Sequence, residues 1–160
     1  MLEIFPEWFQ IFFQSMVPWW EGRYAIPYAM TVFGWQWWQA FPIAVFGNIL
    51  PIPFILLFFG RVEKFLHRYK FWAKILDWLF ERTRRKADAR IQKYEYIGLI
   101  VFVAVPLPFT GAWTGALIAY LFGLNFTKSV ISIFIGVIGA ALIMVILTLT
   151  GQYIWFAFNG

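Results

Sequence analysis

The chain has 160 residues, of which 62% are hydrophobic, 23% are aromatic and 13% are charged, and its formal net charge is +5. Soluble domains carry about 25% charged residues, so this composition excludes an ordinary soluble domain. It predicts a single all-α integral membrane domain over residues 1–160. The absence of cysteine excludes disulfides and thiolate chemistry.

The first apolar stretch, residues 4–38, is interrupted early by Pro18 and by Glu21-Gly22-Arg23. A transmembrane helix needs about 20 apolar residues, and shorter runs are typical of re-entrant segments. Because proline removes a backbone donor and breaks a helix, we predict a re-entrant hairpin here, followed by a spanning helix at 40–60. The predicted break residues are Pro18, Gly22 and Pro27.

Residues 61–95 form a basic segment that contains eleven of the thirteen Lys and Arg residues. Short basic loops are retained on the cytoplasmic side of a membrane. Apolar residues recur in the segment at helical spacing, which predicts a cytoplasmic amphipathic helix that contacts anionic membrane lipids. Nucleic acid is not expected as a partner, because the apolar stripe favours a membrane surface.

The second half of the chain repeats the pattern of the first. Residues 96–124 are interrupted at Pro106-Leu107-Pro108, and residues 129–158 are apolar and long enough to span. We therefore predict a second re-entrant hairpin followed by a second spanning helix. The predicted break residues are Pro106, Pro108, Gly111 and Gly115.

A shift of 89 residues superimposes glycines of the two halves. The pairs are Gly22 with Gly111, Gly34 with Gly123, and Gly47 with Gly136. Matching turns in two apolar halves indicate an inverted-topology repeat of residues 4–60 and 96–158, although coincidence in an apolar chain is the alternative. With 61–95 in the cytoplasm, the repeat predicts a multi-pass protein of the cell membrane with both termini extracytoplasmic.

Glu21 and Arg23 are charged residues in an apolar environment, and such residues inside a membrane usually mark a binding site or a pathway. The planar fork of Arg23 suits a phosphate group. If a phosphate took Arg23, Glu21 would lose its counter-ion and would tend to bind a proton, which would couple anion uptake to protonation. The alternative is a purely structural ion pair.

Three motifs frame these residues: Glu21-x-Arg23-x-Ala25-Ile26-Pro27, Gly47-Asn48-x-x-Pro51-x-Pro53, and Val105-Pro-Leu-Pro-x-Thr-Gly-Ala-Trp-Thr-Gly-Ala116. Over roughly residues 15–140 they resemble the small multi-drug export protein family, within the DedA (VTT-domain, SNARE-associated Golgi protein) superfamily. The resemblance implies two hairpins that face each other from opposite leaflets. It also implies movement of lipids, especially polyprenyl phosphates, with proton coupling.

Two residues depart from the family pattern. Phe109 stands where members usually have glycine, and Thr110 stands where many DedA proteins have a second acidic residue, which puts a two-carboxylate proton relay in doubt. For the polar residues the alternative role is to hold helices together. The candidate substrate-binding residues are Arg23, Glu21, Thr110, Trp113, Thr114 and Asn48, and Glu21 is the candidate proton-coupling residue.

The function that these features favour is translocation of a lipid with a phosphate headgroup. A proton-coupled exporter of hydrophobic cations is the alternative, disfavoured by the positive charge of Arg23, and a membrane scaffold that transports nothing is a third. The sequence has one histidine and no cysteine, so neither an enzyme nor a metal or cofactor is expected. The oligomeric state stays open, with a homodimer as one candidate.

Overall fold

The computed structural model describes residues 5–18, 21–66, 68, 89–106 and 110–159. Within these ranges every regular element is an α-helix and no strand occurs, as expected for an all-α protein. The helices are α1 (Glu7–Met16), α2 (Glu21–Thr31), α3 (Trp37–Ile49), α4 (Pro51–Leu66), α6 (Ala89–Ala104), α7 (Ala112–Leu121) and α8 (Phe126–Asn159).

Two helical segments of the described part of the chain are long and apolar enough to cross a membrane. One segment is α8, and the other consists of α3 and α4, which are joined at Leu50. The backbone of Leu50 stays in the right-handed helical region, and its N–H donates to the carbonyl oxygen of Phe46 at 3.1 Å. The apolar parts, Trp37–Arg61 and Phe126–Trp155, contain 25 and 30 residues, whereas a span needs about 20. The spans predicted at 40–60 and 129–158 coincide with these segments.

Helices extend into both ends of the basic segment 61–95. Helix α4 continues to Leu66 and α6 begins at Ala89, so the ends of the segment 61–95 are extensions of the apolar helices. A formed helix gains one backbone hydrogen bond for each residue added, so it continues past the point where the sequence becomes charged. The centre of the predicted amphipathic helix, residues 69–88, lies outside the described residues.

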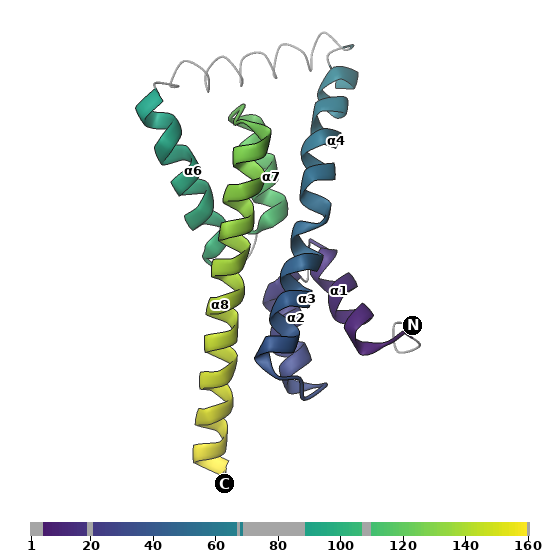
Figure 1. Ribbon diagram of the computed structural model, residues 1–160, viewed down its shortest axis with the longest axis vertical. Helices are drawn as coiled ribbons and strands as arrows, with labels where there is room; N and C mark the ends of the chain where they lie inside the picture. The colour runs from purple at the N-terminus through teal and green to yellow at the C-terminus, as the bar shows by residue number, and fades with distance from the viewer. Residues whose placement is uncertain (1–4, 19–20, 67, 69–88, 107–109, 160) are drawn as a thin grey trace.

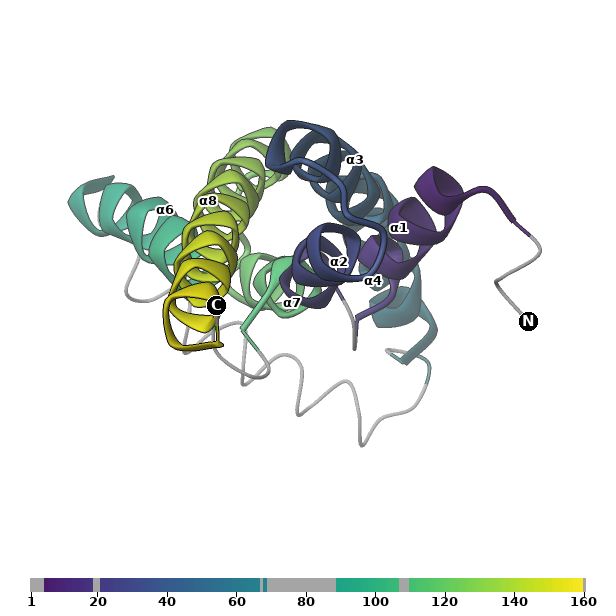
Figure 2. The ribbon, with the colours of Figure 1, turned by 90° about the horizontal axis from the view of Figure 1, so that it is seen from below.

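Two pairs of short helices pack beside the long segments (Figure 1). The pair α1 and α2 occupies one half of the long axis and packs on α3, and the pair α6 and α7 occupies the other half and packs on α8. Across the halves, α2 contacts α8, α7 contacts α4, and α3 contacts α8. Seen along the long axis, α1 and α6 lie on the outside of the arrangement (Figure 2).

Small residues allow the helices to approach closely. A Cβ atom on Gly47 would lie 2.5 Å from the carbonyl oxygen of Phe12 in α1, and one on Gly136 would lie 2.6 Å from Cβ of Val103 in α6. Such small-residue contacts are typical of helix packing in membranes. The buried core is correspondingly rich in alanine, with Ala25, Ala29, Ala40, Ala44, Ala112, Ala116, Ala119, Ala140 and Ala141.

Glycines that pair at the 89-residue spacing have the same local role in both halves. Gly34 follows α2 with φ +67°, and Gly123 follows α7 with φ +63°. Only glycine adopts this left-handed backbone without strain, which is why it commonly ends a helix. Gly47 and Gly136 likewise face the first helix of their own half. The orientation of the two halves relative to a membrane stays a prediction.

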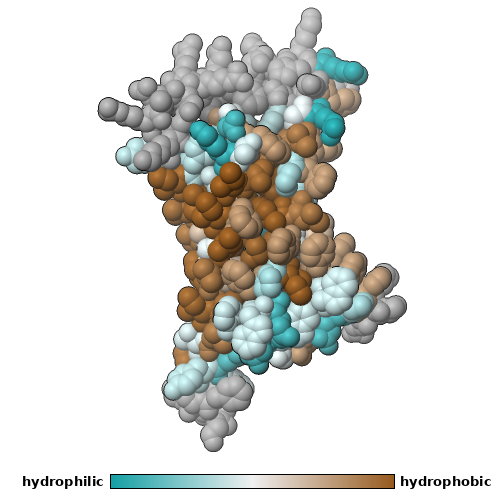
Figure 3. Space-filling model, in the orientation of Figure 1, coloured by the Kyte–Doolittle hydropathy of each residue, from teal (hydrophilic) through white to brown (hydrophobic). Residues whose placement is uncertain are grey.

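The surface shown in Figure 3 has an apolar middle and more polar ends. Large apolar side chains are exposed along α4, α6 and α8, among them Phe54, Phe58, Val101, Ile146 and Leu147. Soluble proteins rarely expose a continuous apolar surface of this kind, and a lipid environment removes its cost. The apolar helices and this surface indicate a membrane protein.

Candidate functional site

Arg23 extends from the first turn of α2 to the break between α6 and α7. Its Nη2 donates to Oγ1 of Thr110 at 3.3 Å, and the Thr110 hydroxyl donates to the carbonyl oxygen of Val105 at 2.8 Å. Thr110 directly precedes the N-cap of α7. The guanidinium group therefore connects the beginning of α2 with the break between α6 and α7.

The N-terminus of α7 is built by Gly111 and Thr114. Gly111 is the N-cap residue, with an extended backbone, and its N–H donates to the Thr114 hydroxyl at 2.9 Å. The same hydroxyl donates to the Gly111 carbonyl oxygen at 3.2 Å. Helices α2 and α7 both begin at a break, so the positive ends of two helix dipoles lie beside Arg23.

Trp113 links the two breaks. Its Nε1 donates to the carbonyl oxygen of Met16 at 3.0 Å. Met16 is the last residue of α1. The α6–α7 pair is thus attached to the end of α1 by an indole and to α2 by a guanidinium. Both contacts join residues of different halves, and the two helix pairs meet near the middle of the long axis (Figure 1).

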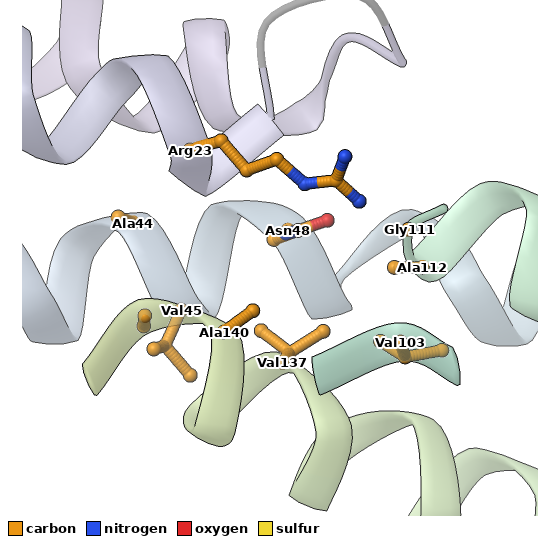
Figure 4. Close-up of a pocket in the computed structure, with 10 residues that line it drawn as sticks. Arg23, Ala44, Val45, Asn48, Val103, Gly111, Ala112, Val137 and Ala140 are labelled. Carbon is orange, nitrogen blue, oxygen red and sulfur yellow. The ribbon is translucent and has the colours of Figure 1, made fainter. Parts of the chain in front are cut away.

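A small cavity lies between these elements (Figure 4). Its volume is about 10 Å³, about the space that one buried water molecule requires. A phosphate group therefore needs the surrounding helices to separate. The lining consists of Arg23, Ala44, Val45, Asn48, Val103, Gly111, Ala112, Val137, Ala140 and Ala141.

Asn48 is the second polar side chain of the lining, on α3. Only 5% of its surface is exposed, and its Oδ1 is buried without a hydrogen-bond partner. Nearly all buried polar atoms in proteins are hydrogen-bonded. The Oδ1 of Asn48 is therefore an acceptor at the cavity wall that no described protein group satisfies.

The polar groups of the cavity come from one half of the chain. The 89-residue shift places Arg23 on Ala112 and Asn48 on Val137, and all four residues line the cavity. In both of these pairs, residues 89 positions apart therefore face the same space. The first half contributes a cation and an amide, and the second half contributes only apolar side chains at these positions.

The model of one protein family, described as "Putative small multi-drug export protein", matches residues 21–143. The chain belongs to this family. A search of curated proteins and a search of solved structures found no match. The matched range includes Arg23, Asn48, the break between α6 and α7 and the whole cavity lining, and the family description is that of an export protein.

The structure brings together part of the predicted site. Arg23, Asn48 and Gly111 line the cavity, and Thr110 contacts Arg23. Thr114 is instead engaged at the helix start and Trp113 at the end of α1. The Glu21 side chain and all of Pro108 lie outside the described residues.

Only some of the predicted break residues that the structure describes lie outside a helix. Pro18 follows α1 and Pro106 follows α6, as predicted for breaks. Pro27, however, lies inside α2, and Gly115 lies inside α7 against Val103. Helices in membrane proteins tolerate such residues when neighbouring helices pack around them. Gly22 lies in the first turn of α2.

The apolar wall of the cavity was not foreseen from the sequence. Ala44, Val45, Val103, Ala140 and Ala141 carry no chemical signal of their own. The 89-residue spacing was the available signal for two further residues, because it relates Ala112 and Val137 to Arg23 and Asn48. Among the residues that the structure describes, no group of three His, Asp or Glu side chains could hold a metal ion.

Proposed function

We propose that this protein is a membrane transporter that moves a lipid with a phosphate headgroup, such as a polyprenyl phosphate or a phospholipid, between the two leaflets. The observation that carries the proposal is the position of Arg23. Among the described residues that line the cavity, it is the only charged one, and it lies where the two helix pairs meet. The resemblance of the chain's sequence motifs to the DedA superfamily implies the same role.

The chemistry of the site favours an anion. A guanidinium binds two oxygens of one phosphate through parallel N–H donors. The N-termini of α2 and α7 add positive dipole ends, an arrangement that transporters use for anionic groups at the membrane midplane. A phosphate that entered here would compete with Thr110 for the Arg23 donors and would weaken the connection between the halves.

This competition supplies a transport mechanism in an inverted repeat. In our proposal, α1–α2 and α6–α7 are re-entrant hairpins from opposite leaflets, with residues 61–95 cytoplasmic and both termini extracytoplasmic. Movement of one hairpin would open the cavity to one leaflet, and movement of the other would open it to the opposite leaflet. Glu21, as the neighbour of Arg23 in sequence, would take up a proton when the phosphate occupies the guanidinium.

The description of the family favours a second candidate, the export of hydrophobic cations. In that case Glu21 and aromatic side chains would bind the substrate. A fixed arginine in the cavity repels a cation, so removal of Arg23 should accelerate cation export and should abolish lipid-phosphate movement. Whether removal of Arg23 raises the rate of cation export or abolishes lipid-phosphate movement therefore distinguishes the two candidates.

The experiment uses the purified protein in liposomes that contain a lipid phosphate with a fluorescent tail. A membrane-impermeant reductant bleaches the outer leaflet, and the slow phase of bleaching reports translocation. Arg23→Ala should reduce the rate to that of protein-free liposomes, and Arg23→Lys should retain only part of it because lysine lacks the planar fork. The matched control is Arg61→Ala, which removes the same charge from an exposed position at the far end of the apolar segment.

Translocation by Arg23→Ala at the wild-type rate would contradict the proposed anion site.

The membrane topology is tested separately by single cysteines, which the cysteine-free chain permits. Cysteines at the exposed N-caps Gln36 and Asn125 should react with impermeant reagents from outside and from inside, respectively. Labelling of both from the same side would contradict the inverted repeat.

A further inference from the structure

The buried acceptor of Asn48 carries information about the headgroup. Its Oδ1 lacks a donor in an environment where such atoms are almost always paired. Arg23, whose Nη2 donates to Thr110, is the one side chain of the described wall with N–H donors besides Asn48 itself, since residues such as Ala44, Val45 and Val137 present only methyl groups. The equivalent position of the second half is Val137, so packing at this position does not require an amide.

The orientation of the amide follows from the charge beside it. Figure 4 shows the oxygen end of Asn48 pointing toward the side where the Arg23 guanidinium lies. The carbonyl oxygen is the negative end of the amide dipole, so a cation favours this orientation, and the reverse one would turn the NH₂ group toward a positive charge. The cavity therefore presents an acceptor next to a cation.

A fully ionised phosphate fits this pair poorly. Its oxygens accept hydrogen bonds from Arg23, but an oxygen that approaches Asn48 meets a second acceptor and is repelled. The conflict disappears when that oxygen carries a proton, because a P–O–H group donates to Oδ1. A phosphate monoester carries this proton in its monoanionic form, whose second ionisation lies near pH 6, whereas an ionised diester has no such proton.

We propose that Asn48 is the specificity-determining residue of the site and that it selects a protonated phosphate monoester over a diester. This inference rests on the proposed function. One proton then crosses with each headgroup, so the headgroup carries one negative charge rather than two. Arg23 is the charged group that faces Asn48 among the described residues of the cavity, and the Glu21 side chain lies outside them.

The test compares two fluorescent lipids that differ by one methyl group, phosphatidic acid and its phosphate methyl ester, in proteoliposomes at pH 6. The wild-type protein should move the monoester at least about 10-fold faster, the penalty expected for an unpaired buried acceptor. Asn48→Leu, which keeps the side-chain size and removes the acceptor, should reduce this ratio severalfold while translocation continues. The wild-type ratio should also fall between pH 6 and pH 8, because the monoester loses its proton.

Two controls distinguish a failure of the Asn48 proposal from a failure of the proposed transport function. Val137→Leu crowds the opposite wall of the cavity and should slow both lipids by the same factor, which leaves the ratio unchanged. Arg23→Ala should stop both lipids. If Asn48→Leu keeps the wild-type ratio, or if the wild-type protein moves both lipids equally, Asn48 is not the selecting residue. If the wild-type protein moves neither lipid, the proposed function itself fails.

Discussion

The contact between α6 and α8 at Gly136 yields the most quantitative prediction. A Cβ atom at this position would lie 2.6 Å from Cβ of Val103, 2.9 Å from its Cγ1 and 2.9 Å from the carbonyl oxygen of Ile100. The oxygen and Cβ of these residues are tied to the backbone of α6 and cannot rotate away. Gly136→Ala therefore requires α6 and α8 to move apart.

The change in the free energy of unfolding caused by Gly136→Ala is the sum of two opposing contributions. Overpacking costs about 1–3 kcal/mol, and the upper end applies because the clash involves backbone. Replacing glycine by alanine in a helix stabilises by about 1 kcal/mol. The net loss of about 2 kcal/mol corresponds to a decrease in the melting temperature of about 4–8 °C for a chain of this length.

The matched control is in the same helix. A Cβ on Gly151 would meet nothing within 4 Å, so Gly151→Ala should raise the melting temperature by about 2–4 °C through helix propensity alone. Thermal unfolding in detergent micelles, followed by tryptophan fluorescence, measures both variants. Equal shifts for Gly136→Ala and Gly151→Ala would refute the close packing of α6 against α8.

Three further changes probe the contacts between the halves in the same unfolding assay. Thr110→Val removes the acceptor of Arg23 and should cost about 1–2 kcal/mol; a melting temperature equal to wild type would show that the contact does not stabilise the fold. Trp113→Phe keeps a six-membered aromatic ring but removes the indole N–H that donates to α1 and part of the packing volume, so a loss of at least about 1 kcal/mol is expected, and a melting temperature equal to wild type would show that the contact with α1 does not stabilise the fold. Gly115→Ala places Cβ 2.6 Å from Cγ2 of Val103, so combining it with Val103→Ala should destabilise by at least about 1 kcal/mol less than the sum of the single variants. Strict additivity would contradict that clash.

The sequence predicted the elements of the fold well where the signal is local. The spans at 40–60 and 129–158 follow from uninterrupted hydropathy, and the breaks at Pro18 and Pro106 follow from the loss of a backbone donor. Pro27 and Gly115 show the limit of this reasoning. Both are helix breakers by propensity, yet tertiary packing keeps them inside α2 and α7.

The site was predicted only in part, because its geometry depends on residues far apart in the chain. The sequence itself determined the membrane class and the presence of two charged residues, Glu21 and Arg23, in an apolar stretch, since hydropathy and residue chemistry do not depend on the fold. Only the tertiary structure decided the partners: Thr110 lies 87 positions from Arg23, and Met16 lies 97 positions from Trp113. It also decided that Asn48 faces the cavity with an unpaired oxygen, because only helix packing determines which wall surrounds an amide.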